Sequence, residues 1–294
     1  MKADGHIKLS VEAIKQMQKN CQVERKLCNL PIFSIGNFSW NNPEASNRID
    51  FVNAFIAYIL NLKAYNFNSF DPRRQLARRV AAVDFDESWT HDAPTGQRYH
   101  FMKSSSESEY DAYINGCSFI KEKMDKWVVQ CQQKINLLNK LQNDGEEGTF
   151  QTRRYGVKYL AEALHALQDS FSPAHTVRSE KITVQIKCYK EAMTKGIDAA
   201  EANHPHPIIK IFDYSEQKHG SPVDIDTPHS KGDIHSGSLN TNSGKLAIKA
   251  TQELITLGLQ SVSQNRSSLI GWGAYKAKWL SQNKLPKIKN NKCL

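Results

Sequence analysis

The feature that most constrains the fold is a long stretch of apolar residues at helical spacing between Glu107 and Leu141. Its apolar positions recur every three or four residues, and they are Ile114, Cys117, Ile120, Met124, Trp127, Cys131, Ile135 and Leu138. Such spacing places the apolar side chains on one face of an α-helix. The sequence therefore predicts one long helix as a principal element of the fold.

The remaining elements are also predicted to be mainly helical. Apolar periodicity and breaker residues favour helices at about 8–19, 48–64, 73–83, 153–169 and 245–263. Asparagine, proline and glycine favour loops at 29–47, 84–106 and 196–244, and one short strand is expected at 181–189. No internal repeat or linker divides the chain. We therefore expect a mainly α fold, a single multi-helix domain over 1–294 with long loops, whose last part (236–294) is a helix and a basic tail.

Composition is that of a globular chain with its own core. The chain has 294 residues, 39% of them apolar, which suffices for a core without disulfides. It contains no run of about 18 apolar residues, so we expect no transmembrane segment. The six cysteines lack zinc-finger spacing. Cys21–Cys28 and Cys117–Cys131 are the nearest pairs in sequence, and both disulfides and free thiols remain open.

Positive charge favours anionic partners without naming one. The net charge is +9. It is concentrated in an arginine cluster and a lysine-rich tail, which comprise Arg73, Arg74, Arg78, Arg79, Lys276, Lys278, Lys284, Lys287, Lys289 and Lys292. Basic faces attract phospholipid headgroups or nucleic acid. A solvated basic surface explains the charge equally well, and no aromatic residues interleave the arginines as in base-stacking platforms.

The stretch from Tyr159 to His175 carries the strongest chemical signal. His165 and Asp169 are four residues apart in a predicted helix, so their side chains project from the same face. Pro173 ends that helix, and the turn can carry His175 back over its end. Imidazole and carboxylate are zinc ligands, and the two carboxylate oxygens of Asp169 allow it to bridge two ions. The alternative is a buried histidine hydrogen-bonded to the aspartate, with His175 unrelated.

The pattern His165-x3-Asp169-x5-His175, with proline just before the last histidine, resembles the zinc-dependent phospholipase C family. That family is related to the single-strand-specific zinc nucleases. Further similar motifs occur in the family's order between residue 6 and about residue 233, and elsewhere the similarity is weak. They are Gly5-His6, Asp84 within Ala81–Asp86, Arg98-Tyr-His100 and His229-x3-Asp233.

Carried over position by position, the resemblance implies three zinc ions clustered in a cleft. The first ligand set is Asp84, His100, His165 and Asp169; the second is the backbone of Met1, His6 and the other oxygen of Asp169; the third is His175, His229 and Asp233. Asp86 is an alternate for Asp84, and His219 with Asp224 is a rival for the last pair. The family usually has tryptophan as its mature first residue, and the gap between His175 and His229 implies an insertion.

The resemblance also implies the reaction. A phospholipase C hydrolyses the glycerol-side phosphodiester of phospholipids with a metal-bound hydroxide, at a headgroup on the membrane surface. Asp84 and Asp169 are the implied catalytic carboxylates, and Asp84 could orient or deprotonate the attacking water. The alternatives are a single-strand nuclease or nucleotidase, which acts on nucleic acid, and a non-enzymatic zinc or lipid-binding module. Trp272, Tyr275 and Trp279 fit either membrane contact or the packed end of a terminal helix.

The beginning of the chain bears on the expected localisation. The first residues, Met1 to His6, are polar and do not resemble a secretory signal peptide. We therefore expect either a secreted protein whose signal has been removed, or a toxin-like effector translocated by a dedicated secretion machine.

Overall fold

The computed structural model describes ten stretches of the chain, which are 3–23, 72–84, 95–143, 157–172, 174–178, 208–213, 239, 242–282, 288–289 and 292–293. Of these residues, 72% are helical and 6% are in strands, so the predicted mainly α fold is confirmed. The predicted loop at 29–47, helix at 48–64 and strand at 181–189 lie outside the described residues.

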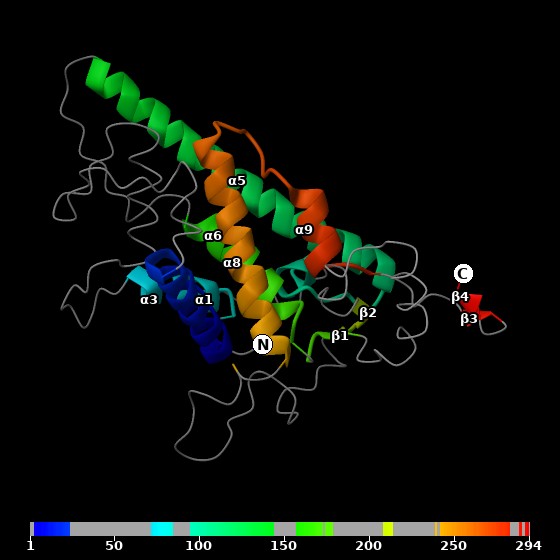
Figure 1. Cartoon of the computed structure of the whole chain (residues 1–294). Coiled ribbons are helices and arrows are strands. Elements are labelled where there is room, and N and C mark those ends of the chain that lie inside the picture. The colour runs from blue at the N-terminus through cyan, green and yellow to red at the C-terminus, as the bar shows by residue number, and fades with distance from the viewer. Residues whose placement is uncertain are drawn as a thin grey trace.

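Six α-helices make up most of the described structure (Figure 1). They are α1 (Ala3–Val23), α3 (Pro72–Ala82), α5 (Glu109–Asn143), α6 (Val157–Asp169), α8 (Asn242–Ser263) and α9 (Trp272–Trp279). A 3-10 helix, η2, spans Gln97–His100. Two antiparallel strand pairs join β1 (Thr176–Arg178) to β2 (Ile208–Ile211) and β3 (Ile288–Lys289) to β4 (Lys292–Cys293).

Local sequence explains where several helices begin. The long helix α5 starts at Glu109 because the Ser108 hydroxyl accepts a 3.1 Å hydrogen bond from the Asp111 amide, which is a helix N-cap. Glu109 and Asp111 also place negative charge at the positive end of the helix dipole. Pro72 occupies the first position of α3, where its missing N–H costs nothing. The helix α1 begins five residues before the predicted start at Lys8 and therefore includes His6.

The helix α6 lies at the centre of the core. Every side chain from Leu160 to Ser170 is buried. The helix packs against α1, α3, α5 and α8, so it is covered on all sides by other helices. Figure 1 shows α1 and α3 side by side and α8 crossing the long α5. Polar groups on α6 are consequently removed from water and must find partners within the protein.

The helices α5 and α8 approach each other closely at Gly258. A Cβ atom at this position would lie 2.1 Å from Cζ3 of Trp127 and 2.8 Å from Cε of Met124. Both of these α5 side chains are fully buried and cannot retreat into solvent. Glycine is therefore required at this crossing.

The pairing of β1 with β2 corrects one prediction. The segment 196–244 was expected to be irregular, but Ile208–Ile211 forms a strand that pairs with Thr176–Arg178. The expectation was wrong there because the partner strand, more than thirty residues earlier in the chain, supplies hydrogen bonds that local composition does not reveal. Ile208 and Ile211 are buried in the core. The strand pair follows directly after His175 and therefore helps to fix that residue.

Cys117 and Cys131 are both free and buried, which answers the open question for this pair. They lie fourteen residues apart on α5, about 21 Å along a helix, too far for a disulfide. Burial raises the pKa of Cys117 to about 12 and also raises the pKa of Cys131. Cys28 and Cys188 lie outside the described residues, as do the side chains of Cys21 and Cys293.

The aromatic residues of α9 are mainly packing residues. Tyr275 and Trp279 are buried, and the Tyr275 hydroxyl donates a 2.9 Å hydrogen bond to the carbonyl of Ala250. Trp272 is half-buried and stacks on Tyr275.

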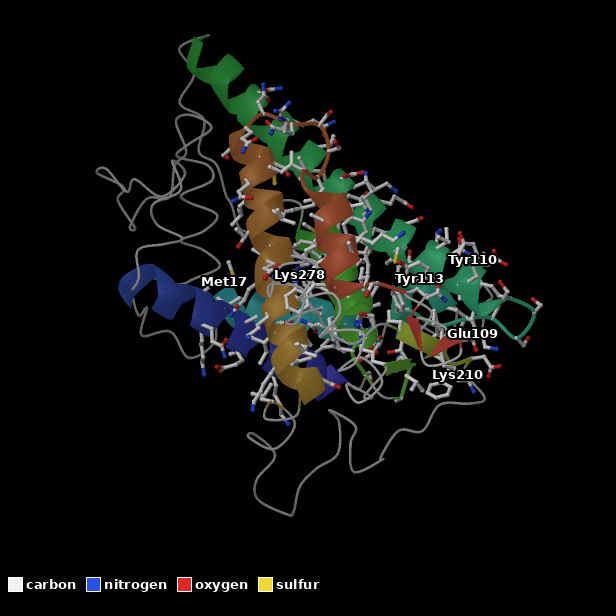
Figure 2. The ribbon with its side chains drawn as sticks, turned by 45° about the vertical axis from the view of Figure 1, so that its right-hand side comes forward. Met17, Glu109, Tyr110, Tyr113, Lys210 and Lys278 are labelled. Atoms are coloured by element: carbon white, nitrogen blue, oxygen red, sulfur yellow. The ribbon has the colours of Figure 1, made fainter. Side chains whose placement is uncertain are left out.

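Figure 2 shows Tyr110, which is 64% exposed, near the outer end of α5. Within the described part of the chain, no helix is both long and apolar enough to cross a membrane.

Candidate metal centre

Six candidate ligands converge on one buried region beside α6. They are His6 of α1, Asp84 just after α3, His100 at the end of η2, His165 and Asp169 of α6, and His175 before β1. The Asp84 side chain is 13% exposed and is the most accessible of the six, while Asp169 is fully buried. Residues far apart in sequence are thus assembled around the central helix.

Asp169 stands at the middle of this cluster and directs its two oxygens to different imidazoles. Its Oδ1 atom lies 3.3 Å from Nε2 of His6. Its Oδ2 atom lies 3.1 Å from Nε2 of His165 and 3.2 Å from Nδ1 of His100. His175 approaches the same Oδ2 at 3.7 Å. This division is the arrangement expected of a carboxylate that bridges two cations.

Asp84 faces the same imidazoles from the other side. Its Oδ1 atom is 3.5 Å from Nε2 of His165 and 3.9 Å from Nδ1 of His100, and its Oδ2 atom is 3.9 Å from Nε2 of His6. Two groups of three have all their ligand atoms within 4.8 Å of one another, namely His6–Asp84–His165 and His100–His165–Asp169. His165 belongs to both groups, so the cluster is continuous.

Hydrogen bonds fix the tautomers of three of the imidazoles. Nδ1–H of His165 donates to the carbonyl of Val80 at 2.8 Å, and Nδ1–H of His175 donates to the carbonyl of His100 at 2.9 Å. Nδ1–H of His6 donates to Oε1 of Gln168 at 2.8 Å. In a neutral imidazole this leaves a lone pair on Nε2, as in metal-binding histidines.

The tautomer of His6 favours a cation on the Oδ1 side of Asp169. Nε2 of His6 presents a lone pair to Oδ1 of Asp169 at 3.3 Å, and two acceptors repel at that distance unless positive charge lies between them. On the other side, Nδ1 of His100 lies 3.0 Å from Nε2 of His165 and 3.2 Å from Oδ2 of Asp169, so its N–H can donate to either acceptor. The Nε2 atom of His6 is buried and makes no hydrogen bond with the described residues. Imidazole nitrogen and carboxylate oxygen are donors that zinc accepts. The cluster therefore could hold a metal ion, although a hydrogen bond between His100 and Asp169 is also present.

The pKa values of Asp169 and His175 are both lowered, which favours their deprotonated forms. Burial alone would raise the pKa of Asp169, but the imidazoles of His175, His165 and His6 hold it well below the ordinary value. Burial lowers the pKa of His175 well below its ordinary value. A carboxylate and a neutral imidazole are the forms that bind metal.

The turn after α6 holds His175 in place. The amide of Ser172 donates to the carbonyl of Asp169 at 2.9 Å, and the amide of His175 donates to the carbonyl of Ser172 at 3.0 Å. The carbonyl of His175 accepts a 2.9 Å bond from the amide of Phe212, next to β2. Arg178 donates to the carbonyl of Ser170 at 3.0 Å and closes the turn from the other end.

Half of the predicted site residues lie outside the described residues. These are Met1, Asp86, His219, Asp224, His229 and Asp233. Of the third implied zinc set, only His175 is described, and of the second, only His6 and Asp169. The described geometry also differs in detail from the implied sets, because Asp84 approaches His6 as well as His100 and His165.

Gln168 is a site residue that the motif search missed. It is fully buried, and its amide contacts His6 directly. Its signal in the sequence is a polar residue beside Asp169 in an otherwise apolar helical stretch. Helical spacing groups residues by face, and the partner of Gln168 lies on a helix at the other end of the chain, so spacing alone does not reveal the contact.

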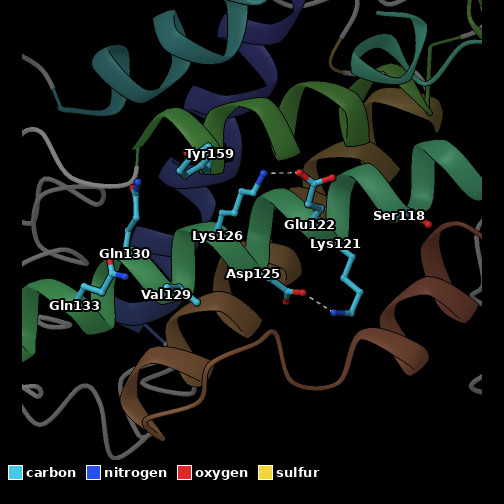
Figure 3. A pocket seen from close by; sticks show the side chains of 9 residues that line it. All are labelled: Ser118, Lys121, Glu122, Asp125, Lys126, Val129, Gln130, Gln133 and Tyr159. Carbon is cyan, nitrogen blue, oxygen red and sulfur yellow. Dashed lines mark hydrogen bonds and ion pairs between the residues drawn. The ribbon is translucent and has the colours of Figure 1, made fainter. Parts of the chain in front are cut away.

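A separate groove of about 570 Å³ lies along α5 (Figure 3). None of the six clustered ligands lines it. Its charged side chains are paired with each other, since Lys121 contacts Asp125 and Lys126 contacts Glu122, both at 2.5 Å. These i,i+4 pairs satisfy the charges within the helix, so the groove offers no comparable chemistry.

Comparison with known proteins adds no information about the candidate metal centre. No family model, curated protein or solved structure matches this chain. The likeness to the zinc-dependent phospholipase C family consequently rests on short motifs and stays a prediction. What the described residues show is a buried histidine–aspartate cluster that could hold a metal ion.

Proposed function

We propose that this protein is a zinc-dependent phosphodiester hydrolase that acts on phospholipids as a phospholipase C. The observation that carries the proposal is the position of Asp169, whose two oxygens face different imidazoles within 3.1–3.3 Å. Asp169 would hold two ions between these imidazoles, and a two-ion site would suit the in-line displacement of a phosphate ester. The order of the sequence motifs supports the same class of reaction.

The residues of the cluster have distinct roles under this proposal. When bound, the divalent ions would neutralise phosphate charge and lower the pKa of the attacking water from about 15.7 to about 7. His6, His165 and Asp169 would hold the ions, because their Nε2 and carboxylate oxygen atoms face one another at 3.1–3.3 Å. Asp84 is the more accessible carboxylate and would orient the water or accept its proton.

The choice of phospholipid over nucleic acid rests on the sequence. The His229-Ser-Lys stretch is more similar to the phospholipase branch of the family, whereas Asp233 and the position of His6 are closer to the nuclease branch. A net charge of +9 suits either polyanionic nucleic acid or an anionic membrane surface. The nuclease activity is therefore the alternative that the experiment must separate.

The test compares two substrates with one preparation. The purified full chain is loaded with zinc and incubated with phosphatidylcholine vesicles or with single-stranded DNA. We expect release of phosphocholine and diacylglycerol, loss of that release with a chelator, and a 10²–10⁴-fold slower rate for Asp84→Asn. Glu122→Gln, in the groove of Figure 3, is the matched carboxylate control and should keep the wild-type rate.

Each other outcome has a definite meaning. Degradation of DNA with intact lipid would replace the phospholipase proposal by the nuclease. Zinc binding with both substrates intact would leave a non-enzymatic metal or lipid-binding module. Absence of bound zinc by mass spectrometric metal analysis would contradict the proposed metal centre itself.

A further inference from the structure

Gln168 joins three helices at the edge of the metal centre. Its Oε1 atom accepts the 2.8 Å bond from Nδ1–H of His6 on α1. Its Nε2 atom donates to Oγ of Ser10 on α1 at 3.0 Å and to Oγ1 of Thr251 on α8 at 3.4 Å. All four side chains are buried, so water does not compete for these bonds.

The orientation of this amide decides which nitrogen of His6 carries the proton. With Oε1 towards His6, the proton is on Nδ1, and the lone pair on Nε2 faces Oδ1 of Asp169 at 3.3 Å. With the amide reversed, its NH2 group would require a lone pair on Nδ1, and the proton on Nε2 would point at Asp169 instead. A proton would then occupy the place that a metal ion needs.

We infer that Gln168 is a positioning residue that holds His6 in the metal-binding tautomer and thereby forms the metal subsite on the Oδ1 side of Asp169. This inference rests on the metal centre proposed above. Acceptors on the remote nitrogen of a ligating histidine also make the imidazole a stronger donor, and their removal typically weakens metal binding 10–100-fold.

The other side of the centre depends on different groups. His165 is oriented by the backbone carbonyl of Val80, and His100 and His165 both face Oδ2 of Asp169. A change at Gln168 should therefore weaken the ion near His6 and spare the ion near His165. This separation is what distinguishes a positioning role from a general loss of stability.

Three variants of the full chain test the inference by zinc titration and metal analysis. Gln168→Leu removes the acceptor at similar volume, and Gln168→Glu keeps an acceptor for Nδ1–H of His6. Gln132→Leu is the matched control, because Gln132 on α5 is also a buried amide and donates to the carbonyl of Val262 on α8. Gln168→Met replaces the leucine variant if that variant does not fold.

We expect the wild type to bind two ions at the described residues. Gln168→Glu and Gln132→Leu should bind each of these ions with an affinity similar to that of the wild type. Gln168→Leu should bind one ion as tightly as the wild type and the second 10–100-fold more weakly. In a His6→Ala background, Gln168→Leu should cause no further loss, because both changes remove the same subsite.

Three results would overturn the inference. If Gln168→Leu binds both ions as tightly as the wild type does, the amide does not position His6. Equal loss in Gln168→Leu and Gln168→Glu, or additive losses with His6→Ala, would indicate a structural role only. If the wild type binds both ions and Gln168→Leu is unchanged, the inference fails alone, whereas a wild type without zinc removes the proposed function and the inference together.

Discussion

The shared position of Asp169 predicts a graded loss of zinc-dependent stability in two variants. Asp169→Asn keeps the shape of the side chain but removes its charge and replaces one metal-binding oxygen by an NH2 group. Because the two oxygens of Asp169 face His6 on one side and His100 with His165 on the other, this change should empty both subsites. His6→Ala should empty only the subsite on the Oδ1 side.

The expected magnitude follows from binding linkage. An ion present at 100 times its dissociation constant stabilises the folded state by about 2.7 kcal/mol. With an unfolding entropy of about 2.1 cal/mol/K per residue, each kcal/mol shifts the melting temperature of a 294-residue domain by roughly 1.6 °C. Each ion should therefore raise the melting temperature by roughly 4 °C, and two ions by about twice that amount.

The measurement is a thermal melt followed by circular dichroism, with zinc and then with excess chelator. We expect the full zinc-dependent shift in the wild type, about half of it in His6→Ala, and almost none in Asp169→Asn. Glu122→Gln, a surface carboxylate on α5, should behave as the wild type. If Asp169→Asn keeps the same shift as His6→Ala, the carboxylate is not shared and the two-ion reasoning is wrong.

Three further predictions concern pH, packing and thiol reactivity. Burial lowers the folded-state pKa of His175 below its unfolded value, so the unfolded chain binds more protons. With a chelator present, the free energy of unfolding measured by urea titration should accordingly decrease as pH falls below about 6.5. This decrease should be shallower in His175→Gln, and equal slopes of stability against pH in the two proteins would refute this cause. Gly258→Ala should destabilise by about 1–3 kcal/mol despite better helix propensity, since its Cβ would meet Trp127, and Gly258→Ala with Trp127→Phe should regain part of that loss in the same assay. Cys117, whose pKa burial raises to about 12, should resist iodoacetamide in the native protein and react in urea, as read by mass spectrometry; rapid native labelling would contradict its burial.

The parts of the fold that could be predicted are those encoded by local spacing. The periodic apolar positions of α5 and the i,i+4 pair His165–Asp169 follow from helix geometry, which acts over a few residues. The strand β2 could not be predicted in the same way, because its short Ile208–Ile211 run is stabilised by pairing with β1. The meeting of His6 with Gln168, 162 residues later, likewise depends on the packing of α1 against α6.

The tautomers of the histidines could not be predicted from the sequence. Motif spacing can indicate that His165 and His175 are ligands, but backbone carbonyls, at Val80 and His100, determine which of their nitrogens carries the proton. Side-chain substitution leaves a backbone carbonyl in place, so His165 keeps its acceptor whatever residue stands at position 80, and His175 keeps its acceptor whatever residue stands at position 100. His6 differs, because its acceptor is the side chain of Gln168. A single substitution at Gln168 should therefore change the metal affinity of the proposed subsite on the Oδ1 side while leaving every proposed ligand intact.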